Sequence, residues 1–368
     1  MDLFNVNINP KAIELANSVL HSGWLNEGKY VGNLESRLKT IFNFTNPISV
    51  NSCTSALHLA LLASGVSTGD EVILSPQTFV ASGISVLMCG ANPVFSDIDP
   101  LTGCLDPEKL EEKITDKTKA VIFIYWGGNV PFSLLEISKI CKRRGLFLIE
   151  DAAHAFGSKI ENSYIGSTKN GFNPDFTCFS FQAIKFVTSG DGGILCVHSD
   201  SLVEKLKRMK WFGLDKNAPR REEGDRGSLI AELGFKYNMN DLTAAIALGN
   251  LENIEERIAQ RIKNALFYKK NLCKVEGLNL LEYCSGSCHW IYTILVENRS
   301  DFIKKMKSNG IPVSVVDRRI DEHPIFGGLT EGLTGQELFD RSQVSLPVHD
   351  NLLQEDLEKI VKLIKGGW

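Results

Sequence analysis

The stretch that decides the fold is Leu146-Phe147-Leu148-Ile149-Glu150-Asp151-Ala152-Ala153-His154, where four apolar residues run directly into two carboxylates. A run that is apolar at every position is typical of a central strand with both faces covered. Similar short runs, bounded by turn residues, occur on either side of it and predict further strands. They cover residues 71–74, 93–96, 120–124, 176–180 and 193–197.

Helical stretches lie between several of these strands, at residues 55–63, 77–89 and 134–144. Strand–helix–strand order predicts a mostly parallel central sheet with helices on both faces, which is an α/β fold. We assign residues 1–240 to this large domain, including an N-terminal arm.

The pattern changes after residue 240. A long, strongly helical stretch covers residues 241–272, and the remainder mixes a strand with two helices. We therefore expect residues 241–368 to form a linking helix and a smaller C-terminal α+β domain. Its strand is predicted at residues 290–296, and its helices at 302–309 and 354–364.

Composition and charge exclude several classes of protein. The 368 residues are 43% hydrophobic and 23% charged, which excludes fibrous, collagen-like and broadly disordered chains. The net charge of −4 favours neither nucleic acid nor an anionic membrane, so a phosphate-bearing ligand needs a local pocket. No apolar run approaches the roughly 20 residues that span a bilayer, and the N-terminus lacks the features of a signal peptide. We expect a cytoplasmic protein.

The nine cysteines are scattered, and most lie in apolar runs, which is typical of small buried residues in a reducing compartment. Cys284, Cys288 and His289 form the one cluster, and a zinc site would need a second ligand pair. We therefore expect no metal.

Polar and charged side chains follow two of the predicted strands. Asp151 and His154 follow one strand, and ligands of open α/β sheets bind at the carboxyl ends of strands. The alternative interpretation of a lone Asp at this position is that it caps the N-terminus of a helix. Lys185 follows the strand that ends at Ser180 and precedes Phe186-Val187. A lysine is usually a solvated charge, but desolvation lowers its pKa and prepares it to form a Schiff base.

The third chemical feature is Asn51-Ser52-Cys53-Thr54-Ser55-Ala56-Leu57, a polar turn that opens a helix. Free N–H groups and hydroxyls at such a turn suit an anion, although a plain N-cap has the same appearance. In chain order the sequence therefore presents a phosphate cup, a strand-end Asp and a strand-end Lys.

This order resembles the fold-type-I pyridoxal-phosphate enzymes, and its details resemble the sugar-nucleotide aminotransferases of the DegT/StrS type. The likeness runs almost from end to end. Its motifs are Ser22-Gly23-Trp24 with Gly28 and Glu35, residues 51–59, 69–73 with Thr78-Phe79, 90–99, 150–157, 180–193, 234–239, and Ser345-Leu346-Pro347.

The resemblance implies a catalytic role for three residues. Lys185 matches the lysine that holds pyridoxal 5′-phosphate covalently and later moves the proton between the amino donor and the cofactor. Asp151 matches the carboxylate that pairs with the pyridine nitrogen, which keeps the ring an electron sink. His154 stands near the ring where the family has Gln or His; a structural histidine is the alternative.

The resemblance also implies contacts with the cofactor. Thr54, Ser55 and Ser180 match the phosphate cup, and Phe79 matches the aromatic residue that stacks on the pyridine ring, unless it is simply part of the core. Lys236 falls in a loop that the family extends across a homodimer, so we expect it at the neighbouring subunit's phosphate or substrate. Asn238, in the same loop, is a candidate substrate residue.

Two segments depart from the family pattern and limit the assignment of the substrate. Residues 125–133 lack the usual His and Asp, and residues 315–323 replace a run that usually contains His. Arg318 and His323 in the second segment are candidates for binding an anionic, hydroxyl-rich ligand, although a solvated loop would have the same composition.

The resemblance implies a homodimeric aminotransferase with shared active sites. It would move an amino group from an amino acid, in the first instance L-glutamate, through pyridoxamine 5′-phosphate to C3 or C4 of a nucleotide-linked keto-sugar. Products of this kind serve surface-polysaccharide, lipopolysaccharide or related amino-sugar synthesis. The alternatives are a pyridoxal-phosphate-dependent sugar dehydratase, against which Lys185 argues, a non-catalytic regulatory relative, and an aminotransferase for a small polyol-phosphate ketone.

Overall fold

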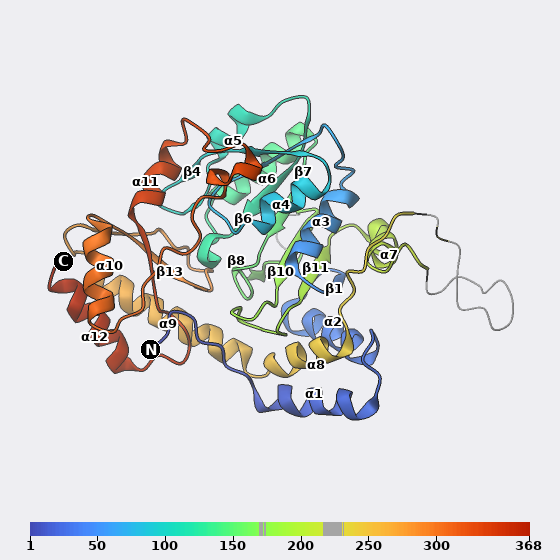
Figure 1. Ribbon diagram of the computed structural model, residues 1–368, viewed down its shortest axis with the longest axis horizontal. Helices are drawn as coiled ribbons and strands as arrows, with labels where there is room; N and C mark the ends of the chain where they lie inside the picture. The colour runs from blue at the N-terminus through green and yellow to red at the C-terminus, as the bar shows by residue number, and fades with distance from the viewer. Residues whose placement is uncertain (169–171, 173, 216–229, 231) are drawn as a thin grey trace, which may run out of the picture.

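The computed structural model describes residues 1–368 except 169–171, 173, 216–229 and 231. Its centre is a seven-stranded sheet with the strand order β1-β11-β10-β7-β6-β2-β3 (Figure 1). All neighbours are parallel except those of β11, which runs antiparallel to β1 and β10. The mostly parallel α/β fold is thus confirmed. The strands are β1 (Pro47–Val50), β2 (Glu71–Leu74), β3 (Asn92–Phe95), β6 (Thr118–Ile124), β7 (Phe147–Asp151), β10 (Phe176–Ser180) and β11 (Gly193–Val197).

Helices cover both faces of this sheet because its strands are apolar on both sides. On β6, Val121 and Phe123 belong to one hydrophobic core, and Ala120 and Ile122 belong to the other. Helices α2 (Lys29–Phe42), α6 (Ser133–Arg144) and α8 (Asp241–Asn250) contribute to the first core. Helices α3 (Cys53–Ala63), α4 (Ala81–Met88) and α7 (Asp200–Met209) contribute to the second.

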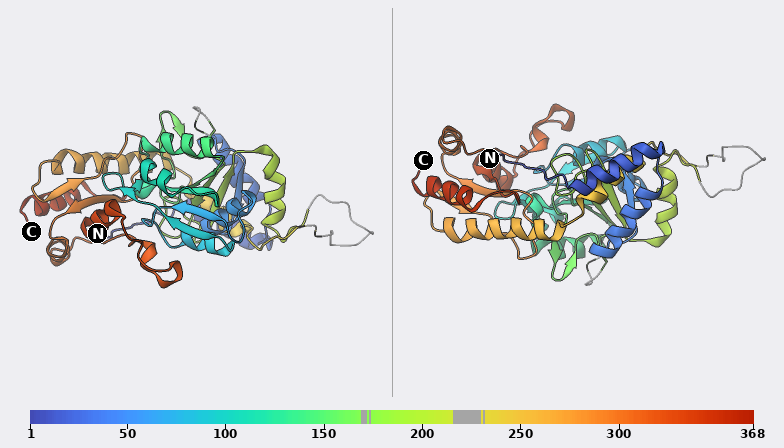
Figure 2. Two further views of the ribbon diagram at one scale, coloured as in Figure 1. Left: turned by 90° about the horizontal axis from the view of Figure 1, so that it is seen from above. Right: turned by 90° about the horizontal axis from the view of Figure 1, so that it is seen from below.

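A smaller antiparallel sheet lies at the other end of the molecule (Figure 2). It has its own hydrophobic core, which includes Ile294, Phe302 and Ile360. Its elements are α9 (Ile254–Leu272), β12 (Leu278–Leu280), β13 (Tyr292–Val296), α10 (Arg299–Ser308), α11 (Thr334–Ser342), β14 (Gln343–Leu346) and α12 (Gln354–Lys365).

The helical stretch expected over residues 241–272 is two helices rather than one. Helix α8 ends at Asn250, and α9 begins at Ile254. Asn253 between them takes a left-handed backbone conformation, with φ 57°, which a continuous right-handed helix does not allow.

The N-terminal arm connects the two ends of the molecule. Helix α1 (Pro10–Ser22) packs so closely on α8 that a Cβ atom at Gly249 would lie 2.3 Å from the backbone nitrogen of Ala12. The first residues then run toward the small sheet, where the carbonyl of Asp2 lies 3.1 Å from Nε2 of His349. Both chain ends therefore lie on the side of the small sheet (Figures 1 and 2).

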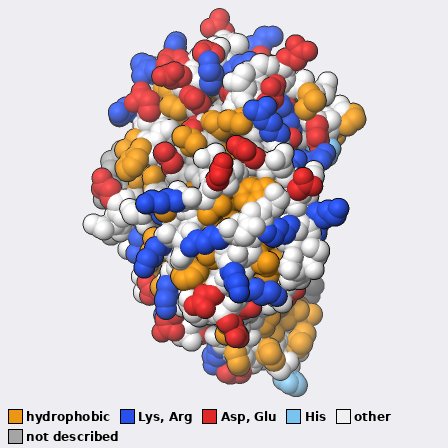
Figure 3. All heavy atoms as spheres, turned by 90° about the vertical axis from the view of Figure 1, so that its left-hand side faces the viewer, with side chains coloured by type: hydrophobic (Ala, Val, Ile, Leu, Met, Phe, Trp, Pro, Cys, Tyr) orange, Lys and Arg blue, Asp and Glu red, His pale blue; other side chains and the backbone are white. Residues whose placement is uncertain are grey.

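The remaining elements are short and lie around the edges. They are β4 (Ile98–Asp99), β5 (Cys104–Leu105), α5 (Pro107–Lys113), β8 (Lys159–Ile160), β9 (Ser163–Tyr164) and 3₁₀ turns at Trp126–Gly128, Ile320–Glu322 and Pro324–Phe326. Within the described ranges, no helix has the length and apolar character that crossing a membrane requires. Acidic and basic side chains are intermingled on the face of the small sheet's helices (Figure 3).

Candidate active site

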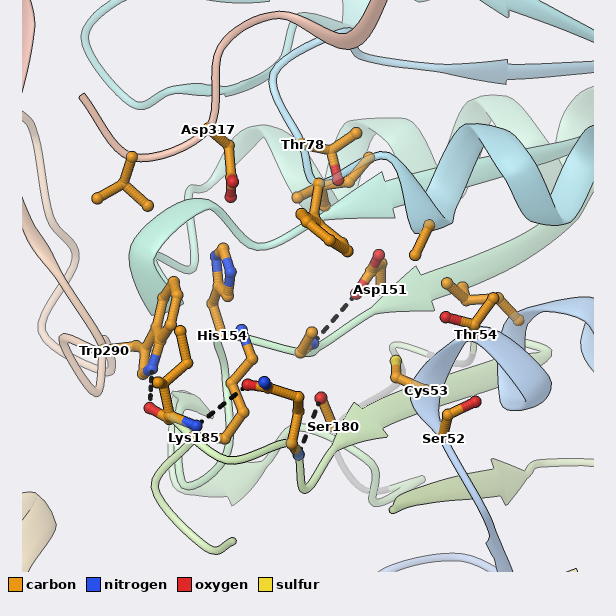
Figure 4. Close-up of a pocket in the computed structure, with 18 of the residues that line it drawn as sticks. Ser52, Cys53, Thr54, Thr78, Asp151, His154, Ser180, Lys185, Trp290 and Asp317 are labelled. Carbon is orange, nitrogen blue, oxygen red and sulfur yellow. Dashed lines mark hydrogen bonds between the residues drawn. The ribbon is translucent and has the colours of Figure 1, made fainter. Parts of the chain in front are cut away.

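A cavity of about 510 Å³ lies at the carboxyl ends of three adjacent strands, β6, β7 and β10. Their last residues, Ile124, Asp151 and Ser180, all line it. The start of α3, the loop after β2 and residues 314–317 of the small domain complete its walls (Figure 4). This is the position at which open α/β sheets bind their ligands.

Asp151 is buried and held in place by two hydrogen bonds. Its carboxylate accepts from the Ser82 hydroxyl at 2.7 Å and from the backbone N–H of Ala153 at 3.1 Å. Burial raises the pKa of Asp151, while these hydrogen bonds and the charge of Lys185 act in the opposite direction. The carboxylate therefore has a fixed orientation toward the cavity.

Lys185 follows β10 in a tight turn, in which its backbone N–H donates to the Gln182 carbonyl at 2.9 Å. Its amine lies 3.6 Å from the ring centre of Trp290. Burial lowers the pKa of Lys185 to about 8, although the charges of Asp317 and Asp151 oppose this shift. Roughly a tenth of the amine is therefore unprotonated at pH 7, far more than for an ordinary lysine, as the apolar sequence around it predicts.

The N-terminus of α3 points at the same cavity. Ser52 caps the helix by accepting from the backbone N–H of Ser55 at 3.1 Å, and Ser52, Cys53 and Thr54 line the cavity. Hydroxyl groups and a helix N-terminus together suit an anion such as a phosphate. Ser55 lies behind this wall, outside the cavity lining, and its hydroxyl donates to Oδ1 of Asn51 at 2.6 Å.

His154 and Phe79 both line the cavity. The His154 ring stacks on Trp290 with centroids 3.9 Å apart, and burial holds the pKa of His154 well below its usual range, so the ring is neutral. Its Nδ1 atom is buried and has no hydrogen-bond partner in the described part of the chain. Phe79 is 59% exposed, which favours a ligand-stacking role over a place in the core.

Besides Ser55, four of the candidate residues from the sequence lie outside the cavity lining as the described residues define it: Lys236, Asn238, Arg318 and His323. The Lys236 amine lies 3.8 Å from the Trp211 ring centre and 2.8 Å from Oδ1 of Asn238. Arg318 and His323 are exposed, and Arg318 pairs loosely with Glu322 at 3.9 Å.

Trp290 and Asp317 are among the residues of the cavity wall that the sequence did not indicate. Asp317 has a left-handed backbone, with φ 48°, and its carbonyl accepts from the side-chain amides of Gln77 at 2.9 Å and Gln343 at 3.0 Å. The departure of residues 315–323 from the family pattern is a sequence signal for Asp317, although the adjacent arginines are the more obvious candidates. Nothing around Trp290 in the sequence marks it.

The chain was compared with known protein families, curated proteins and solved structures. A family model described as the DegT/DnrJ/EryC1/StrS aminotransferase family matches residues 6–365. The spore coat polysaccharide biosynthesis protein SpsC of Bacillus subtilis is 32% identical, over 97% of this chain and 94% of that protein. The UDP-4-amino-4-deoxy-L-arabinose–oxoglutarate aminotransferase of Shewanella sediminis is also 32% identical, over 97% and 95%.

Solved structures give the same result. The sugar aminotransferase CalS13 from Micromonospora echinospora superposes with a TM-score of 0.92 at 29% identity, covering 100% of this chain and 99% of that one. NtdA from Bacillus subtilis, solved with bound cofactor PMP, superposes with a TM-score of 0.85 at 25% identity, covering 98% and 87%. The expected family resemblance is confirmed.

Proposed function

The chain belongs to the DegT/DnrJ/EryC1/StrS aminotransferase family, and from this membership and its cavity we propose a pyridoxal-phosphate-dependent aminotransferase that acts on a nucleotide-linked keto-sugar. The observation that carries the proposal is the meeting of Lys185, Asp151 and the N-terminus of α3 around one cavity. Three separate segments of the chain supply an anion site at residues 52–54, a carboxylate at residue 151 and an amine at residue 185.

The residues present fit pyridoxal 5′-phosphate. Asp151 offers a fixed, buried carboxylate to a protonated pyridine nitrogen. Thr54, Ser52 and Ser180 offer hydroxyls beside a helix N-terminus to the phosphate. The unpartnered Nδ1 of His154 is available for a hydrogen bond with a bound group, and Phe79 presents an exposed ring for stacking. Ser55 would act through the turn that shapes the cup.

The bound cofactor would supply an electron sink for the carbanion at the donor's Cα. Lys185 would move the proton in this reaction: as an amine, its Nζ would accept the proton from the donor's Cα, and as an ammonium group it would pass that proton to the cofactor's carbon. A pKa of about 8 allows both protonation states near neutral pH. The apolar wall around the amine keeps water from competing for the proton.

The substrate class rests on the relatives. One relative is named for the biosynthesis of a spore coat polysaccharide. Another is named as an aminotransferase of UDP-4-amino-4-deoxy-L-arabinose and oxoglutarate. By analogy we propose a nucleoside-diphosphate keto-sugar as the acceptor, amination at C4 or C3, and L-glutamate as the donor. The product would enter polysaccharide or related amino-sugar synthesis.

We also propose a homodimer whose active sites are shared. The loop over residues 234–239 crosses beside Asn51, whose side-chain amide donates to the Lys236 carbonyl at 3.1 Å. The Lys236 amine lies over Trp211, outside the cavity lining of its own subunit. This placement is compatible with a contact to the partner's phosphate or substrate. Asn238, which accepts from Lys236, would orient that amine.

The experiment is transfer of a label. The purified protein, loaded with pyridoxal phosphate, is incubated with ¹⁵N-glutamate and a panel of nucleotide-linked 3-keto and 4-keto sugars that also includes a polyol-phosphate ketone. The products are identified by mass spectrometry. An aminotransferase places ¹⁵N in one of the sugars. A deoxygenated sugar without nitrogen would instead identify a dehydratase, and a product from a polyol-phosphate ketone alone would move the substrate class.

A further inference from the structure

Trp290 contacts the Lys185 segment at two separate points. The ring centre of Trp290 lies 3.6 Å from the Lys185 amine. The indole N–H of Trp290 donates at 3.1 Å to the carbonyl of Ile184, the residue directly before that lysine (Figure 4). One side chain from the small domain therefore touches both the amine and the backbone that carries it.

The indole ring is itself held firmly. His154 stacks on it with a centroid distance of 3.9 Å and an interplanar angle of 20°. Phe4 from the N-terminal arm also stacks on it, at 5.1 Å and 25°. Trp290 is only 3% exposed. His154, Phe4 and the Ile184 carbonyl together fix the ring. Its face is therefore a preorganised surface for a cation.

Several ionisable groups face the same amine. Asp151 at the end of β7, Asp317 from the small domain and Cys53 at the start of α3 influence its charge, and the neutral His154 lies beside it. In the described part of the chain, no carboxylate forms an ion pair with Lys185 within 4.0 Å. Among the described residues, the close partner of the amine is the π face of Trp290.

We propose that Trp290 is a positioning residue for Lys185: its indole face holds the free ε-ammonium group at the cavity wall, and its N–H group fixes the backbone before the lysine. The inference rests on the proposed function, in which Lys185 is free of the cofactor during half of the cycle. During that half, the amine must stay close to the reacting carbon and must carry a proton to return.

The test measures the pKa of Lys185 and needs no substrate. The full-length protein without cofactor is labelled with trace acetic anhydride across a pH series, and the labelling of Lys185 is quantified by peptide mass spectrometry against the exposed Lys39. Native protein is compared with Trp290→Phe and Trp290→Leu. Both variants lose the N–H bond to Ile184, but only Phe keeps an aromatic face, so the two variants are a matched pair.

We expect the pKa of Lys185 in Trp290→Leu to fall by roughly 0.5–1.5 pH units, the equivalent of one cation–π contact. The fall in Trp290→Phe should be smaller. If the ring merely excluded water, its loss would admit water to the amine and the pKa would rise. A rise, or an equal pKa in all three proteins, overturns the proposal.

The Phe and Leu variants could misfold, so a further variant keeps the shape of the Trp290 side chain. Trifluorotryptophan placed at position 290 alone retains the indole outline and the N–H donor, while fluorine weakens the negative ring face. The pKa of Lys185 should again fall, with an unchanged circular dichroism spectrum. A native pKa in this protein would show that the ring only packs. Failure of sugar amination would leave this result untouched, so the two proposals fail separately.

Discussion

Lys185 is the residue on which the proposed chemistry depends, because burial has brought its pKa to about 8 and its amine faces the cavity. We predict that Lys185→Ala folds normally and loses aminotransfer by at least roughly 10²–10⁴-fold, the usual contribution of a positioned acid–base group. Borohydride treatment of the native holoenzyme should fix the cofactor to the peptide that contains Lys185.

Lys39→Ala, at an exposed position on α2, is the matched control and should keep full activity. A borohydride-fixed peptide containing any other lysine would contradict this assignment of the amine.

Asp151 is held by Ser82 and Ala153, so its effect comes from a charge at a fixed position. Asp151→Asn keeps the size of the side chain and removes the charge. We predict a fall in kcat of about 10²–10³-fold, as is found when one preorganised electrostatic partner is lost. Steady-state kinetics at saturating glutamate and sugar measure it. Undiminished turnover would exclude a role for this carboxylate in pairing with the cofactor.

At the scale of single elements, β7 carries two carboxylates of different kinds. Asp151 ends the strand at the cavity, whereas Glu150 accepts from Tyr125 and, at 2.5 Å, from the Thr177 hydroxyl inside the protein. Burial raises the pKa of Glu150 to about 7. Its position in a dry interior should make the stability of the fold depend on pH.

The direction follows from the raised pKa. Between the ordinary value of 4.5 and about 7, folded Glu150 binds more protons than unfolded Glu150, so this group lowers the stability as the pH rises through that window. Glu150→Gln removes the effect. We predict that the variant gains stability relative to the native protein between pH 5 and pH 8, by at most about 3 kcal/mol.

Urea unfolding at the two pH values measures this difference. Asp116→Asn, at an exposed position, is the control and should show no such trend. A difference that does not change with pH would mean that Glu150 keeps an ordinary pKa.

The sequence predicted most elements of the large sheet because its strands are apolar throughout. Strand β1, Pro47-Ile48-Ser49-Val50, was not among the predicted strands. It pairs antiparallel with β11 at the sheet edge, where proline is tolerated. The break between α8 and α9 was also missed, because the left-handed Asn253 has no strong sequence signal.

The cavity was predictable to a similar extent. Thr54 lies at a helix start, Asp151 and Ser180 lie at strand ends, and Lys185 lies in the turn after a strand. Local sequence indicates a site at such positions, and all four residues line one cavity. Trp290 could not be predicted in this way, because its importance comes from contacts with segments more than a hundred residues away.

At the scale of the whole molecule, the cavity depends on both sheets. The large sheet supplies the amine and the carboxylate, and the small domain supplies Trp290 and Asp317. We propose residues 240/241 as the boundary between the two domains, although α8, which directly follows it, packs in a core of the large sheet. Motion of one domain against the other would move Trp290 relative to Lys185, which links the arrangement of the domains to the position of the amine.

The proposed homodimer gives a prediction at this scale. Lys185→Ala and Lys236→Ala subunits should each be strongly impaired alone. If Lys236 serves the partner's site, a heterodimer carries both lesions in one site and neither in the other. Random exchange at equal amounts makes half of the molecules heterodimers, each with one intact site, so about a quarter of native activity should return. Differently tagged subunits verify that heterodimers form; verified heterodimers without activity would place Lys236 in its own subunit's site.

The most direct test of the central claim is the half-reaction with the amino donor alone. The protein loaded with pyridoxal phosphate is mixed with L-glutamate, and the cofactor's absorbance spectrum is followed while 2-oxoglutarate is assayed. The account predicts conversion to the pyridoxamine form with one 2-oxoglutarate per site, and reversal when 2-oxoglutarate is added back in excess. A bound cofactor whose spectrum stays unchanged with glutamate and with every other amino acid would contradict it, and would favour a protein that keeps the fold without the reaction.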